Sequence, residues 1–217
     1  RISAISTGIG TDNIDIVLTE IDALANVNFE NRTINKIKKS LNIIRIGTSG
    51  ALQKEIDVNR LVVSSYGLGF DGLAHFYKSK EILEKKITDS FILDVNWPKN
   101  TAKPYFVKAS KSLIALFPDL KKGITATAPG FYGPQGRTIR IAPSIDNLQE
   151  KMSEFSYKEN QILNLEMETS ALYYLGRTLG HNTLTICAVI GNRLTKEYSN
   201  DYKKTINKLI NLVLERI

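Results

Sequence analysis

Residues 162–190, with the sequence ILNLEMETSALYYLGRTLGHNTLTICAVI, decide the fold class of this chain. The apolar run at 162–167 predicts a buried strand, and residues 168–179 continue with the apolar spacing of a helix that closes at Gly180. A second apolar run at 183–190 predicts another core strand. A strand, a helix and a strand in this order are typical of an α/β domain.

The same alternation of strand and helix patterns extends along the rest of the chain. We expect strands at 1–6, 42–46, 61–65 and 122–128, with a small-residue turn at 47–50. Helices are expected from Thr11 to about residue 25, at 109–117 and at 201–217, with short helices within 81–100. No repeat or linker interrupts the pattern, so we predict one α/β domain over residues 1–217.

The bulk composition excludes several classes of protein. The chain has 217 residues, of which 42% are hydrophobic, enough for one large core. No apolar run reaches the length of a membrane span and the N-terminus lacks a signal pattern, so we expect a cytoplasmic protein without membrane contact. The only cysteine, Cys187, lies in an apolar run and the only histidines are His75 and His181, so neither a disulfide nor a metal site is expected.

The net charge of +7 fits a nucleic acid, an acidic surface or an anionic substrate. Lysines cluster only modestly, at 36–39, 85–86 and 203–208, and no RNA-binding aromatic pattern, zinc finger or arginine-rich tail accompanies them. We therefore predict a solvated basic surface and no nucleic-acid partner.

The segment at 131–137, Phe-Tyr-Gly-Pro-Gln-Gly-Arg, places a carboxamide and a guanidinium two residues apart beside an aromatic ring. Uracil presents O2, N3–H and O4 along one edge. Gln135 can donate to O2 and accept from N3–H, Arg137 can donate to O4, and the base can lie against Phe131. The guanidinium would also stabilise negative charge on a departing base. The alternative is an ordinary surface turn built on Gly-Pro.

The tripeptide Glu166-Met167-Glu168 lies where the strand at 162–167 meets the following helix. A carboxylate there can accept hydrogen bonds from two ribose hydroxyls, and the Met167 thioether can pack on the apolar face of the sugar. Alternatively, Glu168 only caps the helix. Paired carboxylates also occur in glycoside hydrolases, but two residues apart on an extended chain they are poorly placed to flank a scissile bond.

Arg45 lies within an apolar strand pattern and needs an anion or a carboxylate partner, because an unpaired buried charge is very costly. Together with Thr48 and the amides of the neighbouring glycines it would suit a phosphate, and the alternative is an ion pair with a core carboxylate. Gly8-Ile9-Gly10 lacks the third glycine of a dinucleotide-binding fingerprint, so it predicts a turn that lines the site.

Five segments, spread in order over nearly the whole chain, resemble successive motifs of the nucleoside phosphorylases, and most closely their uridine-directed members. They are residues 6–10, 45–50, 131–137, 166–169 and 189–193. The resemblance implies a central mixed, twisted sheet flanked by helices. It also implies a dimer-based homo-oligomer, as large as a hexamer, with sites shared across the dimer interface.

The resemblance assigns roles to single residues of this chain. Those that match phosphate-binding positions are Arg45, Thr48 and Gly10. Those that match the base pocket are Phe131, Gln135, Arg137 and Ile190. Those that match the ribose site are Thr48, Glu166, Met167 and Glu168. Of these, Arg45, Arg137 and Glu168 are the implied catalytic residues.

The implied reaction is phosphorolysis of uridine to uracil and ribose 1-phosphate, with phosphate as co-substrate and without a cofactor or metal. The loop after Ile190 lacks the aspartate that serves the purine N7 in purine-directed relatives. Two alternatives stay open: a nucleosidase of the same superfamily that uses water, and a catalytically impaired nucleoside-binding or nucleic-acid-binding remnant.

The chain also departs from the family pattern. Thr11-Asp12-Asn13 follows Gly10, where the family often has Pro-Ser, so we expect no monovalent cation site. The family's earlier strand and its Gly-Asp phosphate loop have no counterpart in residues 1–217, so we expect part of the phosphate site to be missing from this chain.

Overall fold

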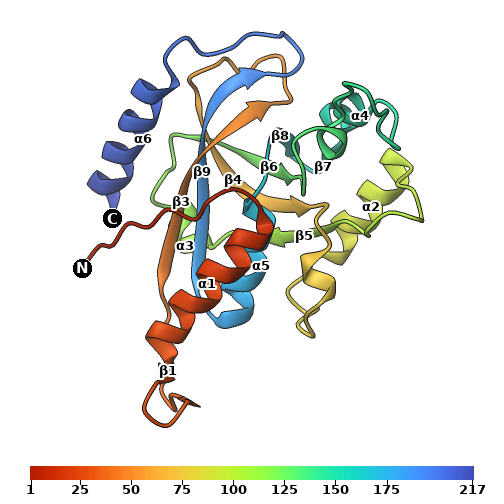
Figure 1. Cartoon of the computed structure of the whole chain (residues 1–217). Helices are drawn as coiled ribbons and strands as arrows, with labels where there is room; N and C mark the ends of the chain where they lie inside the picture. The colour runs from red at the N-terminus through yellow and green to blue at the C-terminus, as the bar shows by residue number, and fades with distance from the viewer.

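Seven strands form one mixed sheet at the centre of the molecule in the computed structural model, which describes residues 1–217 (Figure 1). In spatial order they are β3 (Asn42–Ala51), β9 (Asn182–Asn192), β4 (Leu61–Gly69), β6 (Lys121–Thr127), β8 (Asn160–Glu166) and β7 (Ser156–Tyr157), with β5 (Tyr105–Lys108) paired to β4. β3 is parallel to β9, and β4, β6 and β8 are parallel to one another, but β4 runs antiparallel to β9. The predicted α/β fold with a mixed sheet is confirmed.

The sheet curls until its two sides meet. β3 pairs antiparallel with β8 through Gly50–Leu165 and Ala51–Asn164, so the path of strand pairing returns to its start. This closure brings the end of β3 beside the end of β8, although the two strands are far apart in sequence. Glu166 and Arg193 lie directly beside this junction.

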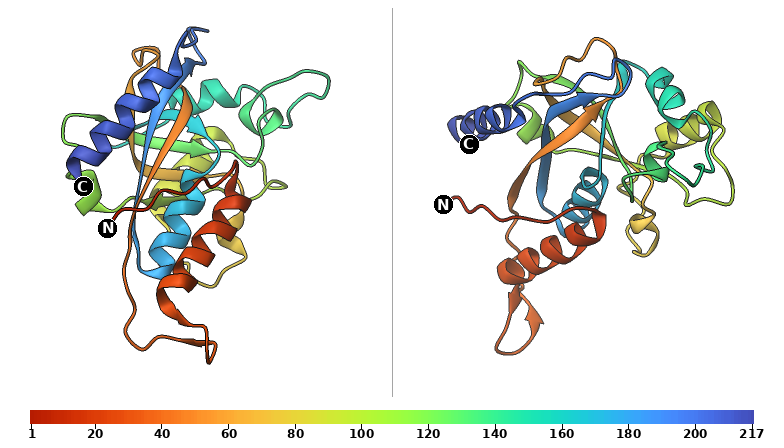
Figure 2. Two further views of the ribbon diagram at one scale, coloured as in Figure 1. Left: turned by 60° about the vertical axis from the view of Figure 1, so that its left-hand side comes forward. Right: turned by 45° about the horizontal axis from the view of Figure 1, so that its top comes forward.

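Helices cover the sheet on both sides (Figure 2). α1 (Thr11–Asn26) packs on α5 (Thr169–Leu179), which lies on β4 and β9. α6 (Tyr202–Arg216) contacts β3 and β9, and α3 (Lys111–Ile114) contacts β9. On the other side, α2 (Lys85–Val95) and α4 (Leu148–Glu154) pack together against β5 and β8. Each side has its own apolar core, in which Tyr173 and Phe91 are among the largest fully buried side chains.

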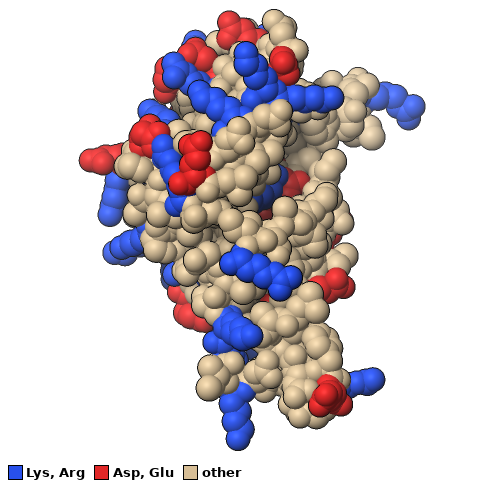
Figure 3. All heavy atoms as spheres, turned by 90° about the vertical axis from the view of Figure 1, so that its left-hand side faces the viewer, with Lys and Arg blue, Asp and Glu red and all other residues tan.

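The remaining regular segments are short. β1 (Val27–Asn28) and β2 (Thr33–Ile34) form a hairpin that projects from the body beyond α1, and η1 (Leu73–His75) and η2 (Gly133–Gln135) are 3₁₀ turns (Figure 1). No helix combines the length and the apolar character needed to cross a bilayer. Lys and Arg side chains are spread over the face drawn in Figure 3, with acidic groups among them.

Several predicted elements were wrong. Residues 1–6 form no strand, because no neighbouring strand accepts their backbone hydrogen bonds, and Ile2 and Ile5 are exposed. The turn expected at 47–50 is a continuation of β3. The helix expected at 109–117 is reduced to α3, because after Ile114 the chain tightens into i→i+3 hydrogen bonds, from the Leu116 amide to Leu113 and from the Phe117 amide to Ile114. β5 and α4 were not predicted.

Candidate functional site

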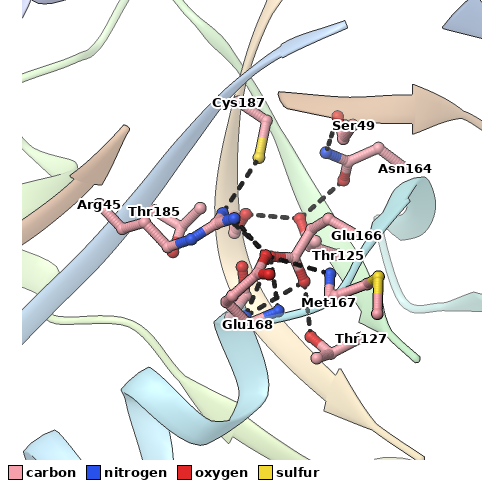
Figure 4. A network of polar contacts seen from close by, with 12 residues as sticks. Arg45, Ser49, Thr125, Thr127, Asn164, Glu166, Met167, Glu168, Thr185 and Cys187 are labelled. Atoms are coloured by element: carbon pink, nitrogen blue, oxygen red, sulfur yellow. Dashed lines mark hydrogen bonds and ion pairs between the residues drawn. The ribbon is translucent and has the colours of Figure 1, made fainter. Parts of the chain in front are cut away.

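A buried arginine faces two glutamates at the junction of β3 and β8 (Figure 4). Nη1 of Arg45 lies 3.0 Å from Oε2 of Glu166, and its Nη2 forms a short ion pair with Oε2 of Glu168. Only 14% of the Arg45 side chain is exposed, and the two glutamate side chains are exposed by 2% and 6%. We call Arg45, Glu166 and Glu168 the carboxylate cluster. The predicted need of Arg45 for a partner is met by carboxylates, which is the alternative that the sequence left open.

The strand around Arg45 is built to admit its guanidinium. A Cβ atom at position 47 would collide with the Arg45 guanidinium, so Gly47 leaves the space that it fills. Cys187, which pairs with Gly47 across the two strands, places its sulfur 3.8 Å from Nη1. Burial disfavours the charged guanidinium, but Glu166, Cys187 and Glu168 outweigh it, so the pKa of Arg45 is raised.

Glu166 supports the surrounding structure. Its carboxylate accepts hydrogen bonds from the Thr127 hydroxyl at 2.7 Å and from the amides of Glu168 and Thr169 at 3.0 Å. The first amides of α5 are thereby satisfied, so Glu166 caps this helix, whereas Glu168 makes no capping hydrogen bond. With Arg45 as a further partner, the carboxylate has no acceptor site left for a sugar hydroxyl. Glu166 therefore supports the fold in this structure, and its contact with ribose remains a prediction.

Glu168 turns away from the helix that it precedes. Its Oε1 accepts the backbone N–H of Gly10 at 2.7 Å, while its Oε2 is bound by Arg45 and by the amide of Met167 at 3.3 Å. Burial raises the pKa of Glu168, and Arg45 opposes this shift. The amide of Gly10, which the family resemblance assigned to phosphate, is thus occupied by a carboxylate in this structure. Glu168 lies between the start of α1 and β3.

Other predicted residues occupy less constrained positions. Thr48 is partly buried on β3 and its hydroxyl makes no hydrogen bond within the chain, so it is free to bind a ligand. Met167 is partly buried, and its side chain points away from Arg45 (Figure 4). Ile190 is partly buried on β9. The roles of these residues remain predictions.

The segment at 131–137 forms a second polar cluster. Gln135 is buried, with 2% of its surface exposed, and its Oε1 accepts from Nη1 of Arg137 at 2.9 Å and from Nη2 of Arg193 at 2.7 Å. We call Gln135, Arg137 and Arg193 the guanidinium cluster. Neither of its arginines forms an ion pair. Burial lowers the pKa of Arg137, and burial together with Arg137 lowers that of Arg193 to about 10.

Phe131 is half exposed, and one face of its ring is already covered. The central guanidinium carbon of Arg137 lies 3.8 Å from the ring centroid, and Arg137 also donates to the Phe131 carbonyl oxygen. A base can therefore stack on this face only if Arg137 moves, which the sequence could not indicate.

Sequence reasoning gave no role to Arg193, although the residue lies in a segment that resembles the family. Its backbone amide donates to the carbonyl of Ala51 at 2.9 Å, and its Nε would lie 2.7 Å from a Cβ atom at position 50. Gly50 therefore provides the space that Arg193 needs beside β3. The only local signal was an arginine directly after a core strand and the buried Asn192, which is too common a pattern to indicate a function.

The two clusters lie around one part of the sheet. The amide of Ala128, three residues before Phe131, donates to the Glu166 carbonyl at 2.9 Å, and Arg193 is joined to the end of β3. Arg45 lies within β3, and the antiparallel pairing of β3 with β8 brings it to Glu166 and Glu168. One cluster offers acidic acceptors and the other offers cationic donors. No group of His, Cys, Asp and Glu side chains is arranged to hold a metal ion.

Comparisons with known proteins identify relatives of the whole chain. A family model described as the phosphorylase superfamily matches residues 1–216. The chain is 27% identical over 209 residues to a uridine phosphorylase of Thermococcus kodakarensis, covering 94% of this chain but only 62% of the length of that relative. It is also 27% identical over 226 residues to a DeoD-type purine nucleoside phosphorylase of Geobacillus stearothermophilus, covering 99% of this chain and 74% of the relative.

A solved structure shows the same fold. The nucleoside phosphorylase of Trypanosoma brucei, reported to show uridine phosphorylase activity, superposes with a TM-score of 0.81 at 26% identity. The match covers 97% of this chain and 78% of that protein.

Proposed function

This chain belongs to the phosphorylase superfamily, and we propose that it cleaves uridine with phosphate to give uracil and ribose 1-phosphate. The observation that carries the proposal is the guanidinium cluster. A buried amide and two guanidinium groups without carboxylate partners converge there, and such donors suit the carbonyl oxygens of a pyrimidine dione. They also suit the negative charge that this base acquires as it leaves the sugar.

The carboxylate cluster is proposed to hold the sugar and the phosphate. Glu168 would accept hydrogen bonds from the ribose hydroxyls, and its charge would stabilise an oxocarbenium-like sugar. Arg45 can keep Nη1 on Glu166 while its other edge turns to the phosphate, and the unpartnered Thr48 hydroxyl can assist.

The proposed reaction uses positioning and electrostatics. The glycosidic bond lengthens first, its electron pair moves to the uracil ring, and the donors of the guanidinium cluster stabilise that charge. A phosphate oxygen then bonds to C1′ from the face opposite the departing base. No covalent enzyme intermediate is needed.

The proposal is tested by following base release from uridine with and without phosphate, and from inosine as a purine comparison. We expect uracil and ribose 1-phosphate to form only when phosphate is present, and uridine to be preferred to inosine. Equal release without phosphate would establish a nucleosidase. Preference for inosine would assign the chain to purine nucleosides, and saturable uridine binding without turnover would indicate a binding protein.

A further inference from the structure

The outer side of α1 and the hairpin of β1 and β2 expose several large apolar side chains. α1 packs on α5, and the residues spaced by four along its opposite side face solvent (Figure 1). Large side chains exposed by 56% to 88% follow one another from this stripe into the hairpin: Ile16, Leu24, Phe29, Ile34 and Ile37. We call residues 12–39 the α1–hairpin surface. Apolar groups gathered in one region of a surface mark a contact with another molecule.

Charge is divided unevenly over the α1–hairpin surface. α1 carries acidic residues and no Lys or Arg, whereas residues 27–40 carry several cations against the single Glu30. The exposed charges are Asp12 and Glu20 on α1 and Arg32, Lys36, Lys38 and Lys39 on the hairpin. None of these side chains forms an ion pair within the chain. The two sets have opposite sign but do not meet within one molecule, because the hairpin projects beyond the C-terminal end of α1 (Figure 1).

The hairpin is held in a fixed direction at its base. The buried side-chain amide of Asn26 donates to the carbonyl of Lys39 at 3.1 Å and accepts its backbone N–H at 2.6 Å, and the Asn26 carbonyl accepts the amide of Asn35 at 2.8 Å. Beyond this base the two strands pair over only two residues each, and so short a hairpin is marginally stable by itself. A partner that covers its apolar side chains would stabilise it.

We propose that the α1–hairpin surface binds a second copy of this chain about a two-fold axis near Leu24, with the hairpin of each protomer lying along α1 of the other. An isologous contact requires a self-complementary surface, and this one carries both halves of the complement. The acids precede Leu24 in the sequence and the cations follow it, so a two-fold axis at this point brings unlike charges together. Leu24 then meets its own counterpart, and the apolar side chains of the hairpin cover Ile16 of the partner subunit. The inference concerns assembly and does not depend on the proposed function.

Sedimentation velocity of the full chain over a range of concentrations tests the proposal. The unsubstituted protein should sediment at micromolar concentration as a dimer or as a larger assembly built from it. Lys36→Glu with Lys38→Glu places like charges against α1, so the dissociation constant of the dimer should rise about tenfold or more. Asp12→Lys with Glu20→Lys should have the same effect from the other side of the contact. Combining all four substitutions exchanges the signs, so it should restore the assembly.

A matched control changes the same charges on another surface. Lys85→Glu with Lys86→Glu alters an exposed pair on α2 that forms no ion pair, and it should leave the assembly unchanged. A monomeric unsubstituted protein would overturn the proposal. An assembly that is indifferent to both charge reversals, or that the four combined substitutions fail to restore, would overturn it too.

An apolar substitution tests the same contact if a charge-reversed variant does not fold. Leu24→Asp puts two carboxylates against each other at the two-fold axis, so it should dissociate the dimer. Leu93→Asp, on α2 and exposed by 78% against 74% for Leu24, should not. Circular dichroism confirms that both variants keep their helices. If Leu24→Asp leaves the assembly intact, the α1–hairpin surface is not the interface.

Discussion

The two clusters balance charge in opposite ways. In the carboxylate cluster one buried guanidinium meets two glutamates and every group has partners within the chain. In the guanidinium cluster two guanidinium groups share one amide oxygen and no carboxylate is present. The first arrangement has partners for every group before a ligand binds and joins β3, β8 and α5, so it supports the fold in addition to its proposed role in holding the sugar and the phosphate. The second has more hydrogen-bond donors than acceptors, and a ligand with carbonyl oxygens or negative charge would supply the missing acceptors, as expected of a recognition surface.

The largest expected effect is on stability and comes from Glu166→Ala. The change leaves the charge of Arg45 less compensated and the first amides of α5 without an acceptor, so we expect a loss of about 3–5 kcal/mol in the free energy of unfolding. Urea denaturation measures it. Glu20→Ala, at an exposed position on α1, should stay within about 0.5 kcal/mol. Equal losses in the two variants would mean that the carboxylate cluster does not stabilise the fold.

Arg137→Ala should show the reverse pattern. The residue is partly exposed and bonds only to its own segment, so the free energy of unfolding should change by less than about 1 kcal/mol. Removing a donor that stabilises the departing base should lower kcat for uridine by about 10²–10³-fold. Steady-state kinetics with Arg140→Ala as the control checks this prediction. Undiminished uridine turnover would refute the role of Arg137.

The sequence predicted the features that depend on local patterns and missed those that depend on contacts between distant segments. Strong local patterns predicted β8, α5 and β9 nearly to their ends, because periodicity and a glycine cap act within one segment. The apolar strand around Arg45 also indicated that its charge needed a partner. The choice of that partner depends on the β3–β8 pairing, which joins residues more than a hundred positions apart and leaves no local signal.

The incorrect strand at residues 1–6 and the unrecognised Arg193 also reflect contacts between distant segments, which local patterns do not indicate. The pattern of residues 1–6 predicts a strand, but a strand requires a neighbour, and local alternation says nothing of one. Arg193 has no role until Gly50 and Gln135, from two other segments, are placed beside it. Residue types along the chain therefore indicate which groups do chemistry, while the tertiary pairing decides which of them support the others.

The pH dependence separates the clusters further. Burial raises the pKa of Glu168 above its ordinary value of 4.5, so the folded protein favours the protonated form. The contribution of Glu168 to the free energy of unfolding is therefore greatest below pH 4.5 and declines as the pH rises through the raised pKa. Arg193, with a pKa of about 10, does not titrate in this range.

Activity should move in the opposite direction, because only ionised Glu168 can accept from the sugar hydroxyls. As the pH rises above 4.5 and through the raised pKa of Glu168, kcat/KM should rise while the stability advantage of the unsubstituted protein over Glu168→Gln falls. Denaturation and kinetics at matched pH values test both trends. A stability difference between the two proteins that stays flat, or that grows with pH, would contradict the assigned shift.

The smallest effect is expected at Cys187, whose neutral thiol contacts Arg45 but does not compensate its charge. Burial raises the pKa of this thiol to about 12, so it is neutral at physiological pH and its sulfur is only a weak acceptor for Nη1. Cys187→Ser keeps an acceptor in nearly the same volume and should cost less than about 1.5 kcal/mol, with uridine turnover retained. Cys187→Ala removes the acceptor and should cost more than the serine variant but less than Glu166→Ala. If Cys187→Ala lowered the free energy of unfolding as much as Glu166→Ala, the neutral sulfur would stabilise Arg45 as much as a carboxylate does. The view that the glutamates supply the stabilising contacts of Arg45 would then be wrong.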